Sequence, residues 1–214
     1  MTPERERKFR QVVYCRQPDL TVVLENVHDP HNIGAVLRTC DAVGVQQIFV
    51  LYTDPRLVSD KLVIGKRTSS GARHWVDVHY YTDPEACFRH VRSLCAQVLA
   101  THLASDSRSL YELDLTVPTA LVFGNEHEGV SQEILRYTDG NFIIPQVGMV
   151  QSLNISVACA VSLYEAFRQR KAAGYYDDKP RLDEQAREAL LEEYRSRHES
   201  KRKGANVVVK RKNP

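Results

Sequence analysis

The sequence predicts an α/β domain whose sheet is mainly parallel and carries helices on both faces. Short apolar runs typical of buried strands alternate along the 214 residues with longer segments whose apolar residues recur at helical spacing. Glycine-containing loops that are too polar for core strands follow the later apolar runs. No internal repeat interrupts this alternation, which favours one α/β domain with appended ends.

In the first half, "TVVLENV" at 21–27 predicts a buried strand and "QQIFVLY" at 46–52 predicts a second. Between them, residues 31–43 have the apolar spacing of a helix, and Gly44 is a suitable residue to end it. The apolar face of this helix consists of Ile33, Val36, Leu37 and Cys40. Residues 54–74 contain an Asp-Pro pair and a polar stretch, which predict a loop-rich connection.

The second half continues the alternation. It predicts, in order, a helix near 83–96, a strand at 96–103, a strand at 119–124, a short helix at 129–137, a strand at 141–145, a long helix from about Ser152 to Ala173, and an amphipathic helix at about 183–199. The "NVVV" run in the last residues fits either a strand or disorder. We expect a basic N-terminal helical extension at 1–18, a central domain at 19–174, and a C-terminal helical extension with a basic tail at 175–214.

Composition is that of a soluble globular protein, with 43% hydrophobic and 26% charged residues. No apolar run approaches the roughly 20 residues needed to span a bilayer, and the charged N-terminus lacks the apolar stretch of a secretory signal. The five cysteines form no CxxC pair and have no histidine partners at zinc-site spacing. We therefore expect a cytoplasmic protein with reduced, mostly buried thiols and no membrane or metal partner.

The net charge of +2 conceals an uneven distribution. Residues 1–16 carry five Lys/Arg and two Glu, and residues 195–214 carry eight Lys/Arg and one Glu. Residues 17–194 hold 16 basic and 24 acidic residues. An acidic body with basic ends suggests that the ends bind a polyanion. Composition alone equally allows solubilising, disordered tails.

The glycine pattern argues against an ordinary nucleotide-binding domain. A dinucleotide fold places G-x-G-x-x-G directly after its first strand, but here that strand leads into "NVHDPHN" without a glycine. A P-loop is also absent from the sequence. The candidate ligand loops are instead "FGNEHEG" at 123–129 and "IPQVGMVQSLN" at 144–154.

Three stretches resemble, in order and separation, the motifs of the SPOUT RNA methyltransferases: "NVHDPHNIGAVLRTCDAVG", "LVFGNEHEGVS" and "IIPQVGMVQSLNISVACA". With the lead-in "RQPDLTVVLENV", residues 8–182 are most similar to the TrmH family of tRNA guanosine-18 2′-O-methyltransferases. The resemblance implies a deep C-terminal trefoil knot, S-adenosylmethionine held by the knot loops, and a homodimer whose active site uses both subunits. It implies tRNA as the substrate and guanosine 18 as the methylated nucleotide.

The same resemblance assigns the cofactor to the loops after the later strands, with contacts from Thr101, Gly124, Ile144, Met149 and Leu153. Gly148 would permit a tight turn, Met149 would offer a soft apolar contact, and Gly124 would let the chain pass close beneath the cofactor. Gln146 departs from the family pattern, in which an apolar residue is expected, and this affects the packing of the cofactor loop.

The catalytic residues implied by the resemblance are Asn32, Arg38, Glu126, Ser152 and Asn154. Arg38 matches the family's essential arginine, and Asn32 the asparagine that orients it. A guanidinium is effectively always protonated, so we favour a cation that stabilises the developing alkoxide over an arginine deprotonated with help from a substrate phosphate. The alternatives are a surface ion pair for Arg38 and a helix-capping role for Ser152.

Glu126 is expected to orient substrate or partner groups across the dimer, unless it is only a solvated loop carboxylate. His28, His31 and His127 lie near the motifs and invite a general-base role. Structural, hydrogen-bonded histidines are the favoured interpretation.

Charge and resemblance together place tRNA phosphates on the basic ends and on the 65–75 loop. The residues are Arg5, Arg7, Lys8, Arg10, Lys66, Arg67, Arg73, Lys201, Arg202 and Lys203. A sister enzyme acting on ribosomal RNA or on another tRNA position would share the catalytic motifs. A non-catalytic RNA-binding module is disfavoured because the motif residues are intact.

Overall fold

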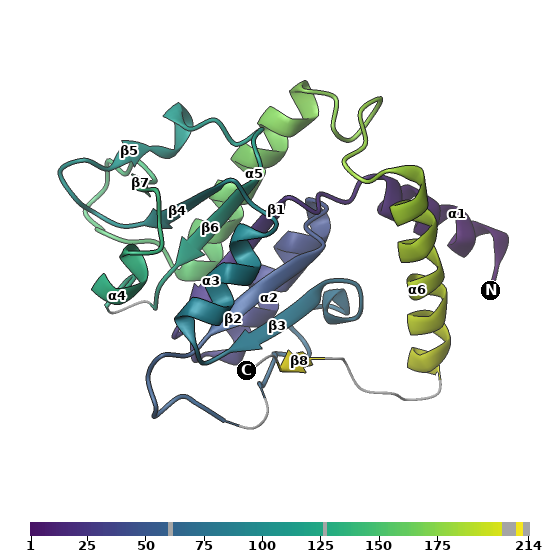
Figure 1. The fold of residues 1–214 in the computed structure, drawn as a ribbon, viewed down its shortest axis with the longest axis horizontal. Coiled ribbons are helices and arrows are strands. Elements are labelled where there is room, and N and C mark those ends of the chain that lie inside the picture. The colour runs from purple at the N-terminus through teal and green to yellow at the C-terminus, as the bar shows by residue number, and fades with distance from the viewer. Residues whose placement is uncertain (60–61, 126–127, 203–208, 212–214) are drawn as a thin grey trace.

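The chain is described by a computed structural model that covers residues 1–59, 62–125, 128–202 and 209–211. Eight strands in these residues form one sheet with the order β5-β7-β4-β6-β1-β2-β3-β8, and every strand pairing is parallel (Figure 1). The bounds are β1 Leu20–Glu25, β2 Gln47–Leu51, β3 Asp77–Tyr81, β4 Gln97–Thr101, β5 Arg108–Ser109, β6 Thr119–Phe123, β7 Gly140–Ile143 and β8 Val209–Arg211. The predicted α/β class with a mainly parallel sheet is confirmed.

Helices cover both faces of the sheet, as Figure 1 shows. The α-helices are α1 Pro3–Tyr14, α2 Pro30–Ala42, α3 Pro84–Arg92, α4 Gln132–Leu135, α5 Ile155–Ala172 and α6 Glu184–Arg202; two 3₁₀ turns are η1 Ala72–His74 and η2 Leu110–Glu112. Aspartate followed by proline begins both α2 and α3. The carboxylates of Asp29 and Asp83 accept hydrogen bonds from backbone N–H groups of the first turn, and the proline that follows needs no donor there.

Two hydrophobic clusters lie on opposite faces of the sheet. One contains Leu24 together with the buried faces of α2 and α5, and the other contains Val23 together with the buried face of α3. Successive residues of β1 thus point to opposite faces, and every residue of the strand is buried. The predicted apolar face of α2 is confirmed, because Ile33, Val36, Leu37 and Cys40 are all fully buried.

The structure corrects the predicted elements at three places. β3 has no counterpart among the strands that the sequence predicts, because the buried His79, which bonds Gln47 through its Nε2, masks the apolar alternation. The two-residue β5 and the turn η2 were missed because both are too short for a periodic signal. The long helix begins at Ile155 and is capped by Asn154, whose Oδ1 accepts from the Ser156 N–H at 2.9 Å, so Ser152 is not its cap.

Two further findings concern the cysteines and the search for membrane-spanning helices. All five cysteines are free, and only Cys15 is not fully buried. Among the described residues, the structure holds no helix that is long and apolar enough to cross a membrane. Of the "NVVV" run, Val209 is the first residue of β8, which lies beside β3 at the sheet edge, and residues 206–208 lie outside the described residues.

The N-terminal helix α1 packs against α6 beside the sheet (Figure 1). Their contact is a separate hydrophobic cluster that includes Phe9, Leu191 and Tyr194, with Trp75 packed against it. The fully buried Arg16 links this pair to the sheet, because its guanidinium donates to the Tyr194 hydroxyl, to Asp41 and to the carbonyls of Val45 and Trp75. The helices α1 and α6 are therefore joined to the central fold. The predicted division of the chain at 1–18, 19–174 and 175–214 stays a prediction.

A second fully buried arginine, Arg170 near the end of α5, pairs with Asp19 at 2.7 Å. Its guanidinium also donates to the carbonyls of Leu115 and Val117, and Arg181 binds the other oxygen of Asp19. Burial would raise the pKa of Asp19, but the hydrogen bonds and charges of Arg181 and Arg170 outweigh burial and lower it. The pair joins the entry of β1, the connection before β6 and the end of α5.

Asp19→Asn should destabilise the protein by about 3–5 kcal/mol at neutral pH, because it leaves a buried guanidinium without its counter-charge. The lowered pKa means that this contribution is present above the unfolded pKa of about 3.9 and is lost as the pH falls through the folded value. Urea unfolding at pH 7 and near pH 3 should therefore show a difference in the free energy of unfolding between variant and wild type that becomes smaller in acid.

The matched control is Asp177→Asn, which removes the partner of Lys171 in an exposed ion pair. Its effect should stay below about 1 kcal/mol. Equal losses in the two variants would contradict the structural importance of the buried pair.

Candidate active site

The carboxyl ends of the parallel strands meet at one edge of the sheet, and the predicted site residues follow these strands. Asn32 lies in the first turn of α2 after β1, and Gly124 directly follows β6. Thr101 ends β4, and Ile144 follows β7. Parallel α/β folds bind ligands at this edge, so the topology gathers residues that are far apart in the sequence.

The closest link among the predicted catalytic residues joins Asn154 and Asn32. The Asn154 Nδ2 donates to the Asn32 Oδ1 at 3.2 Å, while the Asn154 Oδ1 caps α5. The side chain of Asn154 therefore fixes the beginning of α5 and connects it to the first turn of α2. Ser152 is exposed, two residues before this cap.

Arg38 is exposed on α2 and makes no ion pair or hydrogen bond with any residue in the described part of the chain. Other exposed arginines, such as Arg89 and Arg168, are paired with a carboxylate one helical turn away. The alternative that Arg38 serves in a surface ion pair finds no support. A guanidinium that no described residue pairs, six residues after Asn32 on the same helix, is available to a ligand oxygen.

The loop after β6 is a tight turn built on two glycines. A Cβ at Gly124 would lie 1.8 Å from the Gly129 carbonyl oxygen, and Gly129 itself has a φ of 68°. The Gly129 N–H donates to the Asn125 carbonyl, and the Asn125 Oδ1 accepts from the Glu128 N–H at 2.8 Å. Gly124 is thus required by contact with its own loop, whereas the sequence analysis expected it to make room for a cofactor. Glu126 and His127 lie between these anchors and outside the described residues.

A buried carboxylate that the sequence analysis did not single out supports this loop. Glu25 ends β1, and its Oε2 accepts from the Ser131 N–H at 2.9 Å. Its Oε1 is buried and has no hydrogen-bond partner in the part of the chain that the structure describes. Burial raises the pKa of Glu25, and the charges of Glu133 and Glu128 raise it further. The acidic residue at the end of the buried run "TVVLE" is the sequence signal for this contact, because a buried carboxylate requires hydrogen-bond donors from a neighbouring segment.

The expected cofactor loop at 144–154 has an irregular, mostly exposed backbone. Val147 and Met149 have relative exposures of 106% and 99%, whereas Ile144 packs partly against the main core. Gly148 has no positive φ, and a Cβ there would meet open space, so the predicted need for glycine at a tight turn was wrong. The structure brings Asn32 and Asn154 together but leaves Met149 apart from them on the surface.

Residues 19–164 match the sequence model of the SpoU rRNA Methylase family. The chain belongs to this family. It is also 46% identical over 193 residues to the tRNA (guanosine(18)-2'-O)-methyltransferase of Thermus thermophilus, which covers 90% of this chain and 96% of that protein.

Solved structures agree with this assignment. The crystal structure of the A. aeolicus TrmH/SpoU tRNA modifying enzyme matches with a TM-score of 0.81 and 37% identity, over 92% of this chain and 96% of that one. The SpoU methyltransferase AviRb from Streptomyces viridochromogenes, solved in complex with the cofactor AdoMet, matches with a TM-score of 0.63 and 28% identity, over 73% and 60%.

In this SpoU methylase, the predicted RNA-binding residues differ in what they contact. Arg7 and Lys8 are exposed on α1, with no ion pair to a described residue. Arg10 is paired with Glu6 and Glu188, and Arg5 lies over the rings of Phe9 and Trp75. Of the 65–75 loop, Lys66 and Arg67 are exposed and Arg73 is half-buried. Lys201 and Arg202 end α6, and Lys203 lies outside the described residues.

Two substitutions separate the roles of Asn154 in this methylase. Asn154→Ala should lower the free energy of unfolding by about 1 kcal/mol, because α5 loses its cap. Asn154→Ser should retain most of that stability, since serine also caps helices, but its shorter side chain cannot reach Asn32. Methyl transfer to RNA should fall in both variants; full activity of the serine variant would contradict a role for the link to Asn32.

Proposed function

We propose that this chain transfers a methyl group from S-adenosylmethionine to the ribose 2′-hydroxyl of guanosine 18 in tRNA. The observation that carries the proposal is the guanidinium of Arg38, which has no partner among the described residues, on the helix whose first turn bonds Asn154. The curated relatives from Thermus thermophilus and the A. aeolicus structure support the substrate, because they cover nearly the whole chain.

The chemistry requires a hydroxyl oxygen to become negatively charged while it attacks. S-adenosylmethionine would supply the activated methyl group: the bond from the 2′-oxygen to the methyl carbon forms as the sulfonium–methyl bond breaks, S-adenosylhomocysteine leaves, and the hydroxyl proton passes to solvent. Arg38 binds the attacking oxygen as a cation and stabilises the charge that develops on it, which needs no proton transfer to the arginine. Asn32, in the first turn of α2, orients Arg38, and Asn154 holds Asn32 through the 3.2 Å hydrogen bond.

The loop at 144–154 fits S-adenosylmethionine. No backbone group of residues 145–153 bonds to another backbone group in the described chain, so these donors and acceptors are available to a ligand. The exposed Val147 and Met149 offer apolar contacts to an adenine ring. We assign the cofactor to this loop together with Thr101, Gly124, Ile144 and Leu153.

The strand order supports a trefoil knot. β7 lies between β4 and β5, so the connection from β4 through β5 and η2 to β6 passes around β7. The chain that leaves β7 then enters α5, where Gln169 accepts from the Leu115 N–H and donates to the Leu113 carbonyl. The segment after β7 is therefore bordered by the connection from β4 to β6, which comes earlier in the sequence. Threading of 144–154 through this connection is the arrangement that we propose.

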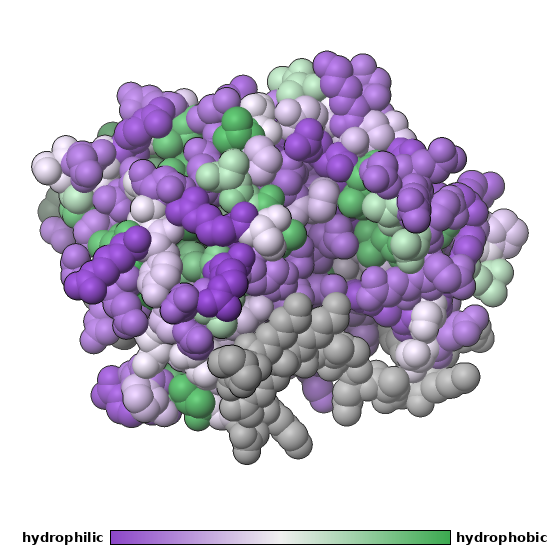
Figure 2. Space-filling view, viewed as in Figure 1, coloured by the Kyte–Doolittle hydropathy of each residue, from purple (hydrophilic) through white to green (hydrophobic). Residues whose placement is uncertain are grey.

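A homodimer accounts for apolar side chains that the chain leaves exposed. Val157 and Tyr164 on α5 are about half-exposed, and Val147, Met149 and Val150 are more so. On the face seen in Figure 2, hydrophobic side chains are scattered among hydrophilic ones. The exposed apolar side chains make α5 and the adjoining loop candidates for a subunit contact. We also propose that the second subunit completes the active site. The protein would act in the cytoplasm, where tRNA is modified.

Arg38→Ala should abolish methyl transfer while the affinity for S-adenosylmethionine stays within a few-fold of wild type, because Arg38 serves the hydroxyl. The measurement maps the 2′-O-methyl group after incubation with labelled cofactor and either bulk tRNA or ribosomal RNA, and calorimetry follows cofactor binding. Methylation of ribosomal RNA alone would contradict the proposed substrate, and lost cofactor binding in the variant would make Arg38 structural.

Arg7 and Lys8 of α1, which pair with no described residue, give a separate test of tRNA binding. Replacing Arg7 and Lys8 by alanine should weaken binding and reduce the slope of log affinity against log salt by roughly 0.7–0.9 for each lost phosphate contact. Arg10→Ala is the control, because its guanidinium is already paired with Glu6 and Glu188. Equal slopes for the wild type and the double variant would show that α1 does not bind phosphate.

A further inference from the structure

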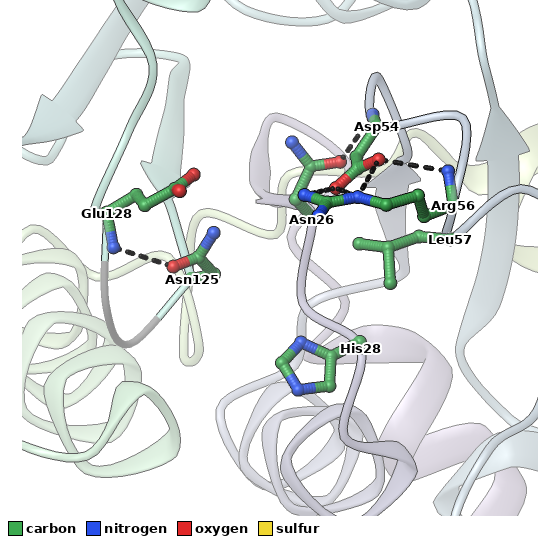
Figure 3. Close-up of a pocket in the computed structure, with 7 residues that line it drawn as sticks. All are labelled: Asn26, His28, Asp54, Arg56, Leu57, Asn125 and Glu128. Atoms are coloured by element: carbon green, nitrogen blue, oxygen red, sulfur yellow. Dashed lines mark hydrogen bonds and ion pairs between the residues drawn. The ribbon is translucent and has the colours of Figure 1, made fainter.

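A pocket of about 250 Å³ lies among the loops that follow β1, β2 and β6 (Figure 3). It is lined by Leu57 and by six polar or charged residues, Asn26, His28, Asp54, Arg56, Asn125 and Glu128. None of these residues belongs to the catalytic or cofactor set described above. The pocket nevertheless borders both segments that carry that set, since His28 lies four residues before Asn32 and Glu128 two residues after Glu126.

One wall of the pocket is fixed by Asn26, which has a φ of 52°. Its Oδ1 accepts from the N–H groups of Thr53 and Asp54, and its Nδ2 donates to the Thr53 hydroxyl. Asp54 in turn accepts from the Nε and Nη2 of Arg56 at 3.0 and 2.7 Å. A non-glycine residue in the left-handed region needs such support, and here the support holds the turn that carries Arg56.

The Asp54 carboxylate occupies only one edge of the Arg56 guanidinium. The Nη1 group of Arg56 makes no hydrogen bond within the described residues, so the opposite edge keeps donors that face the pocket. These are the donors with which arginine binds the O6 and N7 atoms of guanine.

The opposite wall presents a free carboxylate. Glu128 is exposed, its backbone is held by Asn125, and its side chain makes no ion pair with a described residue. Figure 3 shows the Glu128 carboxylate and the Arg56 guanidinium pointing toward one another across the pocket. The hydrogen bonds that Arg56 donates to Asp54 chiefly raise the pKa of Arg56, and the charge of Glu128 adds to the effect.

We propose that this pocket binds the guanine base of the nucleotide whose ribose is methylated. The Glu128 carboxylate accepts from the N1–H and the N2 amino group, and the free edge of Arg56 donates to O6 and N7. Adenine cannot replace guanine in this arrangement, because its N1 is an acceptor and would face the carboxylate. This assignment rests on the proposed function, since it presupposes a guanosine as the methyl acceptor.

The test compares one tRNA transcript that carries guanosine at position 18 with the same transcript carrying inosine, which lacks only the N2 amino group. Wild type should prefer guanosine by about tenfold in kcat/KM, the value of a hydrogen bond to a charged group. Glu128→Gln should lower kcat/KM for guanosine by about 10- to 100-fold and bring the guanosine-to-inosine ratio close to one. Thermal melting and cofactor affinity should match wild type in this variant.

The matched control is Glu133→Gln, which neutralises an exposed carboxylate on α4 outside the pocket. It should keep the wild-type ratio and a rate within about twofold. An active wild type whose guanosine-to-inosine ratio is unchanged in Glu128→Gln overturns the base pocket alone. A wild type that leaves guanosine 18 unmethylated overturns the proposed function, and with it this assignment.

Discussion

The buried ion pair of Arg170 and Asp19 connects three segments that are far apart in the sequence. Arg170 lies near the end of α5, Asp19 precedes β1, and the carbonyls of Leu115 and Val117 belong to the connection before β6. A guanidinium cannot shed its charge, so all of these acceptors must stay in place once it is buried. The end of α5 is thereby fixed relative to β1, and with it the direction in which its first residue, next to Asn154, points.

The functional edge combines this fixed framework with exposed loops. Glu25 and the two glycines at 124 and 129 hold the loop after β6 at both ends, while the loop at 144–154 is exposed along most of its length. This division suits an enzyme that must place a methyl donor and a bulky RNA at the same edge. The core supplies the geometry, and the loops supply surface that a ligand can cover.

Much of the fold follows from local patterns. All five predicted strands and the helix at 31–43 correspond to observed elements, because apolar spacing reports which face is buried. β3 was missed since His79 is buried inside it through a hydrogen bond to Gln47, a partner on another strand. The start of α5 was misplaced by a few residues because Ser152 and Asn154 are both good caps, and only the hydrogen bond to Ser156 distinguishes them.

The sequence by itself determined the α/β class, the order of most elements, and the family motifs that carry Asn32, Arg38 and Asn154. Tertiary structure alone decided which charged residues are buried and which polar groups meet. Arg16, Arg170 and Glu25 are charged yet buried, and their hydrogen-bond partners come from distant segments. The pocket of Asn26, Arg56 and Glu128 likewise exists only where three loops converge at one edge of the sheet. Local periodicity cannot report such convergence, because it depends on the order in which parallel strands pair.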